Sequence, residues 1–306
     1  MKKMTIVMGQ KGGFGNQLFQ YAAGTYYAEK YRAHLEIVPT TDLRHLVSFG
    51  EQRPFLLSEF QVEAKLRARN LTDKIKTSPL PLAAPLTVTA RRFTRTIQVE
   101  DTANDVEQTC WDFFPELPVT PSTRTVYLQG YFQVYEYAAA VEPQLRRQFV
   151  LRSQPQGKNL EVLHQIQQTP AAVSVHLRGG DYKKFYNGKH LLTPTYYRNA
   201  MERIKAQVPN PTYFVFSNDE EFARETIPDS GNVVFVNHND DSTSHHDMLL
   251  MAACRHNIIA NSSFSWWGAW LNPNPGRIVC APHPWMDPKN SYDSLLPPDW
   301  LRVPTT

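Results

Sequence analysis

The sequence predicts an α/β protein that is built from two parallel-sheet units. Short apolar strands alternate with helices, most regularly after residue 171, and this alternation is typical of parallel sheets with right-handed crossovers. A glycine loop joins the first strand to the first helix, and polar residues follow three of the later strands. The 306 residues are enough for two such units. We expect the first unit to span residues 1–160 and the second residues 161–306.

The composition is that of an ordinary globular protein, and it argues against several classes of partner and cofactor. The formal net charge is only +3, so nothing in the charge balance indicates nucleic acid. Cys110, Cys254 and Cys280 are far apart and form no Cys-x-x-Cys pair, which disfavours a disulfide framework or a zinc site. No apolar run reaches the roughly 18 residues of a membrane span, and no signal peptide is visible. We therefore expect a cytoplasmic protein.

The first unit begins with a strand, a glycine loop and a helix. Residues 4–8 form the strand and residues 12–15 the loop, and we expect Asn16 to cap the helix that follows. A second strand is expected over residues 34–38. A glycine-rich turn at a helix N-terminus suits an anion. The loop is not a dinucleotide fingerprint, because Leu18 occupies the position of the third glycine, so a nicotinamide cofactor is not indicated.

Residues 63–98 differ from the rest of the first unit because basic side chains and prolines dominate them. We expect an irregular, partly helical insertion here. Its basic face is most simply a solvated surface, and the alternative is contact with an anionic membrane surface. A strand over residues 125–131 and one helix over residues 135–149 complete the predicted unit. The eight basic residues of the insertion are Lys65, Arg67, Arg69, Lys74, Lys76, Arg91, Arg92 and Arg95.

The second unit shows the clearest alternation of strands and helices. Helices are expected over residues 194–208 and 220–226. One more helix is expected after Ser244, because residues 244–247 resemble a capping box, and another is expected after Asn261. The predicted strands cover residues 172–177, 212–216, 233–236, 257–260 and 277–281.

Polar residues occupy the ends of three of these strands. They are His176, Arg178 and Asp181 on the first, residues 217–219 on the second, and residues 261–265 on the fourth. The carboxyl ends of parallel strands meet at one sheet edge, where α/β proteins bind ligands. An arginine and a serine-rich helix start together suit phosphate oxygens. Taken one at a time, the same segments are equally well explained as an Arg–Asp pair, helix caps and core tryptophans.

A metal centre and a covalent hydrolase are both disfavoured. His245 and His246 are adjacent, so they point in different directions on a helix, and neither they nor His238 and His256 have a carboxylate pair at ligand spacing. No nucleophile elbow or Ser-His-Asp order is present. We expect neither a metal ion nor another cofactor.

Four separated blocks of the sequence resemble glycosyltransferase family 11, the α-1,2-fucosyltransferases. Residues 12–22, GGFGNQLFQYA, closely resemble the N-terminal signature of that family. Residues 176–182, HLRGGDY, are similar to its His-x-Arg-Arg-Gly-Asp-Tyr segment. Residues 216–219, FSND, and 258–269, IIANSSFSWWGA, are similar to the two downstream segments, in the order of the family. The resemblance extends over nearly the whole chain.

The resemblance implies a GT-B type fold, with two Rossmann-like domains and the active site in the cleft between them. It implies inverting, metal-independent transfer of L-fucose from GDP-β-L-fucose to the 2-hydroxyl of a terminal galactose. The first domain would then be the acceptor-side domain and the second the GDP-fucose-binding domain. The expected acceptor is a galactose-terminated glycan, in bacteria a lipid-linked precursor of O-antigen biosynthesis, which would bring the enzyme to the inner membrane face.

On this resemblance, Arg178 engages the donor diphosphate and compensates the charge of the leaving GDP. Asp181 and His176 are the candidates for the general base, and a phosphate oxygen of the leaving group is the alternative. The expected GDP-fucose contacts come from the glycine loop and the three strand ends. They are Gly13, Phe14, Gly15, Asn16, Arg178, Ser217, Asn218, Asp219, Asn261, Ser262, Ser263, Phe264 and Ser265.

One position departs from the family pattern, because the second arginine of the family segment is Gly179 here. If the first arginine carries the catalysis, activity survives this change, and Lys183 and Lys184 are the candidates to compensate. The same change favours an alternative, a nucleotide-sugar-binding module that has lost catalysis. Another nucleotide-sugar transferase of the same fold is a third hypothesis.

Overall fold

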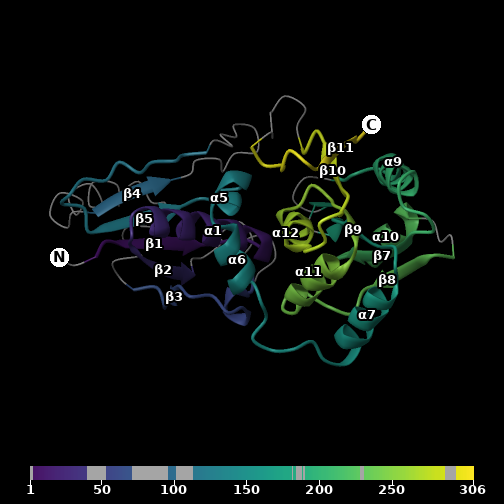
Figure 1. Ribbon diagram of the computed structural model, residues 1–306, viewed down its shortest axis with the longest axis horizontal. Coiled ribbons are helices and arrows are strands. Elements are labelled where there is room, and N and C mark those ends of the chain that lie inside the picture. Colours follow the sequence, from purple (N-terminus) through teal and green to yellow (C-terminus); the bar gives the residue numbers. More distant parts are fainter. Residues whose placement is uncertain are drawn as a thin grey trace. The chain divides into compact units, whose positions relative to one another are not determined.

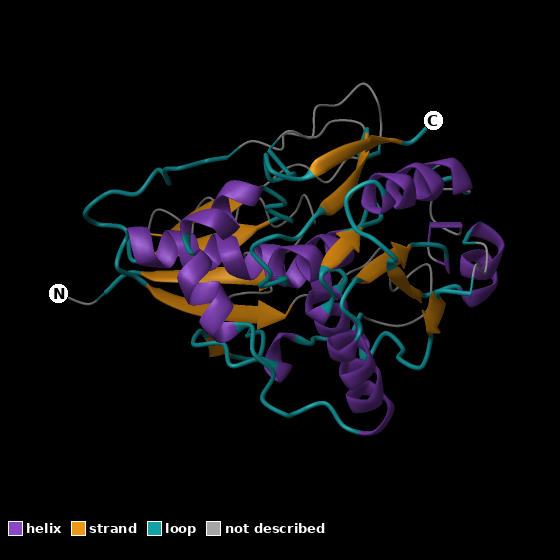
Figure 2. Ribbon diagram, turned by 45° about the vertical axis from the view of Figure 1, so that its right-hand side comes forward, coloured by secondary structure: helices purple, strands orange, loops and turns teal. Residues whose placement is uncertain are grey.

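The chain forms two compact units, Met1–Arg152 and Ser153–Thr306, in the computed structural model (Figure 1). Each unit is a parallel sheet with helices packed against it, so the predicted fold class is confirmed (Figure 2). The expected boundary at residue 160 falls inside helix α7 (Gly157–Gln168), which belongs to the second unit. The structure describes residues 3–39, 53–70, 96–100 (backbone only), 113–180, 182–183, 188, 190–227, 231–286 and 294–306.

The strands of the first unit are β1 (Thr5–Gln10), β2 (His34–Pro39), β3 (Lys65–Leu66), β4 (Thr96–Glu100) and β5 (Thr125–Gln129). They form one parallel sheet in the order β3-β2-β1-β5-β4. The chain moves outward from β1 to β2 and β3, and then returns through β4 and β5 on the other side of β1. The topological switch point, where ligands bind in such sheets, therefore lies between β1 and β5.

Helix α1 (Phe14–Lys30) follows the glycine loop, but Asn16 is not its cap as predicted. The N-cap is Gly13, whose carbonyl accepts from the backbone N–H of Asn16 at 2.9 Å. The Asn16 side chain turns instead to the other side of the switch point, where its Oδ1 accepts from Gln133 Nε2 at 2.6 Å. The hydrogen bond with Gln133, a residue far away in the sequence, has outweighed the preference of Asn16 to cap the helix.

The predicted single helix over residues 135–149 is wrong, because the chain forms α5 (Tyr135–Ala140) and α6 (Glu142–Gln148). The break falls at Val141, where φ is −122°. Pro143 explains it, since proline lacks the N–H of a continuous helix and its ring clashes with the preceding turn.

The basic insertion is only partly described, because residues 71–95 lie outside the described residues. Its two described flanks contribute β3 and β4 to the first sheet and contain no helix. A 3₁₀ turn, η1 (Leu57–Glu59), precedes it.

The strands of the second unit are β6 (Ala172–Leu177), β7 (Thr212–Ser217), β8 (Val233–Val236), β9 (His256–Ile258), β10 (Val279–His283) and β11 (Leu301–Pro304). They form a parallel sheet in the order β11-β10-β9-β6-β7-β8. From β6 the chain first builds β7 and β8 on one side, and then β9 to β11 on the other. The switch point of this sheet therefore lies between β6 and β9.

The helices of the second unit are α7, α9 (Pro194–Lys205), α10 (Glu220–Thr226), α11 (Ser244–Ala253) and α12 (Ser263–Leu271). Helix α7 and strand β11 were not predicted. The predicted capping box at Ser244 is wrong, because the N-cap of α11 is Thr243, whose side chain makes no capping hydrogen bond. The preceding turn is stabilised by Asp240, which accepts from the backbone N–H groups of Ser242 and Thr243. Within the described ranges, no helix is long and apolar enough to cross a bilayer.

The two faces of β6 are sorted by the alternation of its side chains. Val173, Val175 and Leu177 join the core beneath α9, which includes the buried Tyr196 and Tyr197. Ser174 and His176 point to the opposite face, where Asn257 Nδ2 donates to Ser174 Oγ at 2.7 Å and the His176 ring lies 5.5 Å from that of Phe264 in α12. Arg178 directly follows β6 and is partly buried.

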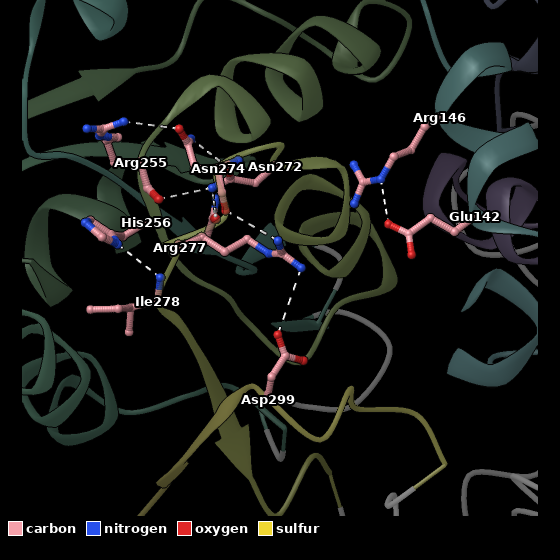
Figure 3. A network of polar contacts seen from close by, with 10 residues as sticks. Glu142, Arg146, Arg255, His256, Asn272, Asn274, Arg277, Ile278 and Asp299 are labelled. Atoms are coloured by element: carbon pink, nitrogen blue, oxygen red, sulfur yellow. Dashed lines mark hydrogen bonds and ion pairs between the residues drawn. The ribbon is translucent and has the colours of Figure 1, made fainter. Parts of the chain in front are cut away.

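A network of polar contacts surrounds the segment that follows α12, and Figure 3 shows its part around Asn272 and Asn274. Asn272, directly after α12, is fully buried and donates to the Cys254 carbonyl at 2.9 Å and to Asn257 Oδ1 at 2.8 Å. Asn257 in turn donates to the Met251 carbonyl of α11 at 2.9 Å. The Asn274 backbone N–H donates to Asn272 Oδ1 at 2.9 Å. These bonds join α11, β9 and α12, so they set the position of the helix that begins at the switch point.

We predict that Asn272→Ala lowers the free energy of unfolding by about 2–4 kcal/mol, because it removes several hydrogen bonds from buried polar groups. Urea unfolding followed by circular dichroism measures this. Asn274→Ala is the matched control, since Asn274 is only half-buried, and it should cost less than half as much. Equal losses in the two variants would contradict the assignment of Asn272 as the centre of the network.

Candidate functional site

The predicted meeting of three strand ends is present in the second sheet. Strand β6 lies between β9 and β7. The register pairs Leu177 with Ser217, so β6 and β7 end together, and it pairs Val175 with Ile258, so β9 ends two residues earlier at the same edge. The residues that follow, 178–180, 218–219 and 261–265, are thus brought together at the switch point between β6 and β9.

The segment after β6 is packed against the end of β7. The Gly179 N–H donates to Asn218 Oδ1 at 3.1 Å. A Cβ at Gly179 would lie 2.7 Å from the Asp219 Cβ, a distance that real Cβ atoms essentially never adopt, and a tight 3.0 Å from the Phe222 ring. Position 179 therefore needs glycine for a steric reason, as long as residue 219 carries a Cβ in this place. The half-exposed Arg178 directly precedes this contact.

The chain then makes one turn that is bound to the strands on both sides. The Lys183 N–H donates to the Gly179 carbonyl at 3.0 Å and closes the turn. Tyr182 Oη donates to the Asn261 carbonyl, beyond β9, at 2.7 Å. Lys183 Nζ pairs with Asp219 Oδ2, beyond β7, at 2.6 Å. Asp181, one of the two predicted bases, and Lys184 lie outside the described residues.

Asp219 caps α10 as well as binding Lys183. Its Oδ1 accepts from the Phe222 N–H at 3.0 Å. Burial opposes ionisation of this carboxyl, but the bonds from Lys183 and Phe222 outweigh it and lower the pKa of Asp219. The same pair raises the pKa of Lys183. Ser217 Oγ accepts from the Asp219 N–H at 3.0 Å, so Ser217 supports the turn itself.

The serine-rich start of α12 divides into internal and outward side chains. Ser262 is the N-cap and accepts from the Phe264 N–H at 3.3 Å. Ser265 is buried and donates to the Ala260 and Ser262 carbonyls, while the buried Asn261 donates to the His190 carbonyl at 3.0 Å. Ser263 is half-exposed in the first turn. A helix N-terminus next to an arginine is suited to bind phosphate.

The glycine loop of the first unit is held by buried glutamines that sequence reasoning did not single out. Gln17 Nε2 donates to the Gly12 carbonyl at 3.2 Å and to the Pro54 carbonyl at 2.8 Å. Gln20, which is fully buried, exchanges hydrogen bonds with the Lys11 backbone and donates to the Gly130 carbonyl. Gly12 has φ +80°, and a Cβ there would lie 2.7 Å from Asn16 Nδ2.

Other predicted residues of the loop have mixed placements. Phe14 is buried and its ring stacks on Phe60 at 5.4 Å, so it belongs to the core. Asn16 lies at the switch point of the first sheet, bonded to Gln133. Tyr131, beneath Lys11 Nζ at 5.0 Å, borders the same loop. The aromatic and amide residues that follow β5 are the signal that would have identified Tyr131 and Gln133.

A polar cluster joins α7 to the first turn of α11. His238 Nε2 bonds Asn159 Oδ1 at 2.8 Å, and Asn239 donates to Asp247 Oδ1 at 2.6 Å. Burial raises the pKa of Asp247 to about 7, although the bond from Asn239 opposes this shift. Burial, and then the charge of His246, lower the pKa of His245 to about 4. Among the residues that the structure describes, no group of three or more His, Cys, Asp or Glu side chains is placed to hold a metal ion.

We predict that Asp247→Asn is progressively stabilised relative to the wild type as pH rises from about 4 to about 7. The native Asp247 holds a proton that the unfolded chain releases near its ordinary pKa, so wild-type stability falls over this range by at most about 1.4 kcal/mol per pH unit. The opposing contribution of His245, whose pKa is lowered, is common to both proteins and cancels in the difference. Chemical unfolding at several pH values measures this difference, and parallel stability curves would contradict the prediction.

Comparison with known proteins bears out the family resemblance. Residues 4–303 match the model of glycosyl transferase family 11. The chain is 29% identical over 316 residues to an alpha-1,2-colitosyltransferase of Escherichia coli, covering 98% of this chain and 99% of that one. It is 26% identical over 270 residues to galactoside alpha-(1,2)-fucosyltransferase 1 of Homo sapiens, covering 85% and 63%.

The fold is shared with a solved fucosyltransferase of low sequence identity. The NodZ alpha-1,6-fucosyltransferase from Bradyrhizobium, in crystals soaked with GDP-fucose, superposes with a TM-score of 0.55 at 15% identity, covering 91% of this chain and 95% of that one. This similarity supports the two-sheet architecture alone. The family assignment rests on the sequence match, which spans almost the whole chain: the protein belongs to glycosyl transferase family 11.

Proposed function

We propose that this family 11 glycosyltransferase transfers L-fucose from GDP-β-L-fucose to the 2-hydroxyl of a terminal galactose in a glycan. The observation that carries the proposal is the position of Arg178 directly after β6, beside β9, the strand that α12 follows in the chain. An obligate cation and a helix N-terminus together match a diphosphate. The human relative, named as a galactoside alpha-(1,2)-fucosyltransferase, supports fucose and galactose as the sugars.

In the proposed reaction the 2-hydroxyl oxygen of the acceptor bonds to the anomeric carbon of fucose. The bond from that carbon to the β-phosphate oxygen breaks on the opposite face, and its electron pair leaves with GDP, so the configuration inverts. Arg178 compensates the negative charge that develops on the leaving phosphate. The hydroxyl proton passes to a base.

The burial of His176 argues against it as that base. His176 is 3% exposed and its ring packs on Phe264, a position better suited to supporting the first turn of α12 than to reaching an acceptor. Asp181 remains a proposed base, and a phosphate oxygen of the leaving GDP is the alternative. Asn16 and the backbone from Gly13 to Gly15 remain proposed contacts of the sugar.

Colitose is the second candidate for the transferred sugar. The relative with 29% identity is named an alpha-1,2-colitosyltransferase. Colitose is L-fucose without the 3-hydroxyl, and a site that hydrogen-bonds this hydroxyl rejects the deoxy sugar strongly. Parallel assays with GDP-fucose and GDP-colitose decide which donor has the higher kcat/KM.

We predict that Arg178→Ala lowers kcat by about 10²–10³, the usual effect of removing one preorganised donor to a developing anion. Arg178→Lys should recover only part of the rate, because lysine keeps the charge and loses the planar fork. Initial rates of GDP release at saturating donor measure both. Arg203→Ala, on the exposed face of α9, is the control and should be unaffected.

We predict fucose transfer to lactose from GDP-fucose in the presence of EDTA, because Arg178 supplies the positive charge at the leaving group. Mass spectrometry of the product and GDP release follow the reaction. A strict requirement for manganese would contradict the metal-independent mechanism. Tight binding of GDP-fucose with no transfer to any galactoside of an acceptor panel would instead support a binding module that has lost catalysis.

A further inference from the structure

The turn from Gly179 to Lys183 joins the ends of all three strands at the switch point. It starts from β6, reaches β9 through the Tyr182–Asn261 hydrogen bond, and reaches β7 through the Lys183–Asp219 ion pair. We propose that Lys183 is a positioning residue that holds this turn, and with it Arg178, in the geometry that clamps the diphosphate. The inference rests on the proposed function and deepens it.

The segment that Lys183 anchors is intrinsically loose. Gly179 and Gly180 directly follow Arg178, and two successive glycines have more backbone freedom to lose than any other pair. Without external bonds, the Arg178 guanidinium would sample many positions. A 1 Å misplacement at a reacting centre is enough to reduce a rate strongly. The site therefore depends on contacts that fix the chain on the far side of the glycines.

The contacts of Gly179 and Gly180 fix only one side of this segment. The Gly179 N–H is bound by Asn218, and the α-carbons of Gly179 and Gly180 lie against Asp219 and Asn218. This packing holds the glycines only while the turn stays pressed against β7. Lys183 supplies that constraint twice, through its backbone N–H to the Gly179 carbonyl and through Nζ to Asp219.

The ion pair also explains why Lys183 positions the segment rather than replacing a missing charge. Its Nζ lies 2.6 Å from Asp219 Oδ2 and 5.3 Å from the centre of the Phe222 ring, the two groups that exclude a side chain from position 179. The positive charge of Lys183 is therefore balanced by a carboxylate. Glycine at 179 lets Asp219 approach, and the approach of Asp219 gives Lys183 its partner.

The test compares Lys183→Met with Lys205→Met. Both lysines are about half exposed, at 46% and 47%, and each pairs with one carboxylate, Asp219 or Glu202. GDP is the probe, and its Kd is measured by calorimetry in the wild-type and Arg178→Ala backgrounds. We expect Lys183→Met to weaken GDP binding and lower kcat about tenfold in the wild-type background. In the Arg178→Ala background its effect on Kd should be less than about twofold, because Lys183 acts through Arg178.

Three results would overturn the inference. If Lys183→Met and Lys205→Met have the same Kd for GDP and the same kcat, the ion pair of Lys183 does not position Arg178. An undiminished effect in the Arg178→Ala background would show that Lys183 contacts GDP itself. Failure of Lys183→Arg to restore most of the affinity would exclude the pair with Asp219 as the cause. Exposed ion pairs contribute little to stability, so the melting temperature of Lys183→Met should stay within about 3 °C of the wild type.

Failure of the proposed function is a separate outcome. A wild-type protein that binds GDP but transfers no fucose, with Kd still sensitive to Lys183, would leave the positioning role intact and remove the proposed reaction. Fucose transfer by the wild type, together with a Kd and a kcat that do not change in Lys183→Met, would support the proposed reaction and remove the positioning role. Tyr182→Phe, which removes only the bond to the Asn261 carbonyl, tests the opposite anchor of the same turn.

Discussion

The switch point of the second sheet depends on the buried pairing of Asn257 with Asn272. A parallel sheet brings strand ends to one edge, but it does not determine how the following helices are placed over that edge. The two fully buried amides bind the end of α11, strand β9 and the end of α12 to one another. Each unmade bond would carry the full desolvation penalty, so only one arrangement of α12 satisfies all of them.

Internal hydrogen bonds also fix the start of α12. Most of the polar side chains that look like ligand contacts in the sequence are used inside the protein: Asn261, Ser262 and Ser265 all bond backbone groups. Their function is to fix the direction of the first helical turn. In the proposed function, the charge of Arg178 and the dipole of α12 meet the anion, which is the usual pattern of electrostatic preorganisation.

Sequence patterns predicted the second sheet better than the connections around it. Strands β6, β7 and β8 and helix α10 agree with their predicted ranges within a residue, because strong apolar runs alternate with clear helix starts. Helix α7 was missed, since only Val162 and Ile166 are buried and its N-cap, Gln156, makes no side-chain bond. Strand β11 has four residues, of which only Val303 is buried. The steric reason for Gly179 was beyond any sequence pattern, because Asp219 is forty residues away along the chain.

The close approach at Gly179 also constrains how this protein can change over evolutionary time. An arginine at 179 cannot be accommodated until Asp219 moves away. Loss of Asp219 alone removes the cap of α10, at a cost of about 1 kcal/mol, together with the partner of Lys183. Neither single substitution is neutral, and any replacement of Asp219 other than glycine keeps the β-carbon that lies 2.7 Å from the place of a Cβ at position 179. Positions 179 and 219 therefore form an epistatic pair, because a side chain can enter position 179 only after the backbone that carries residue 219 has moved away.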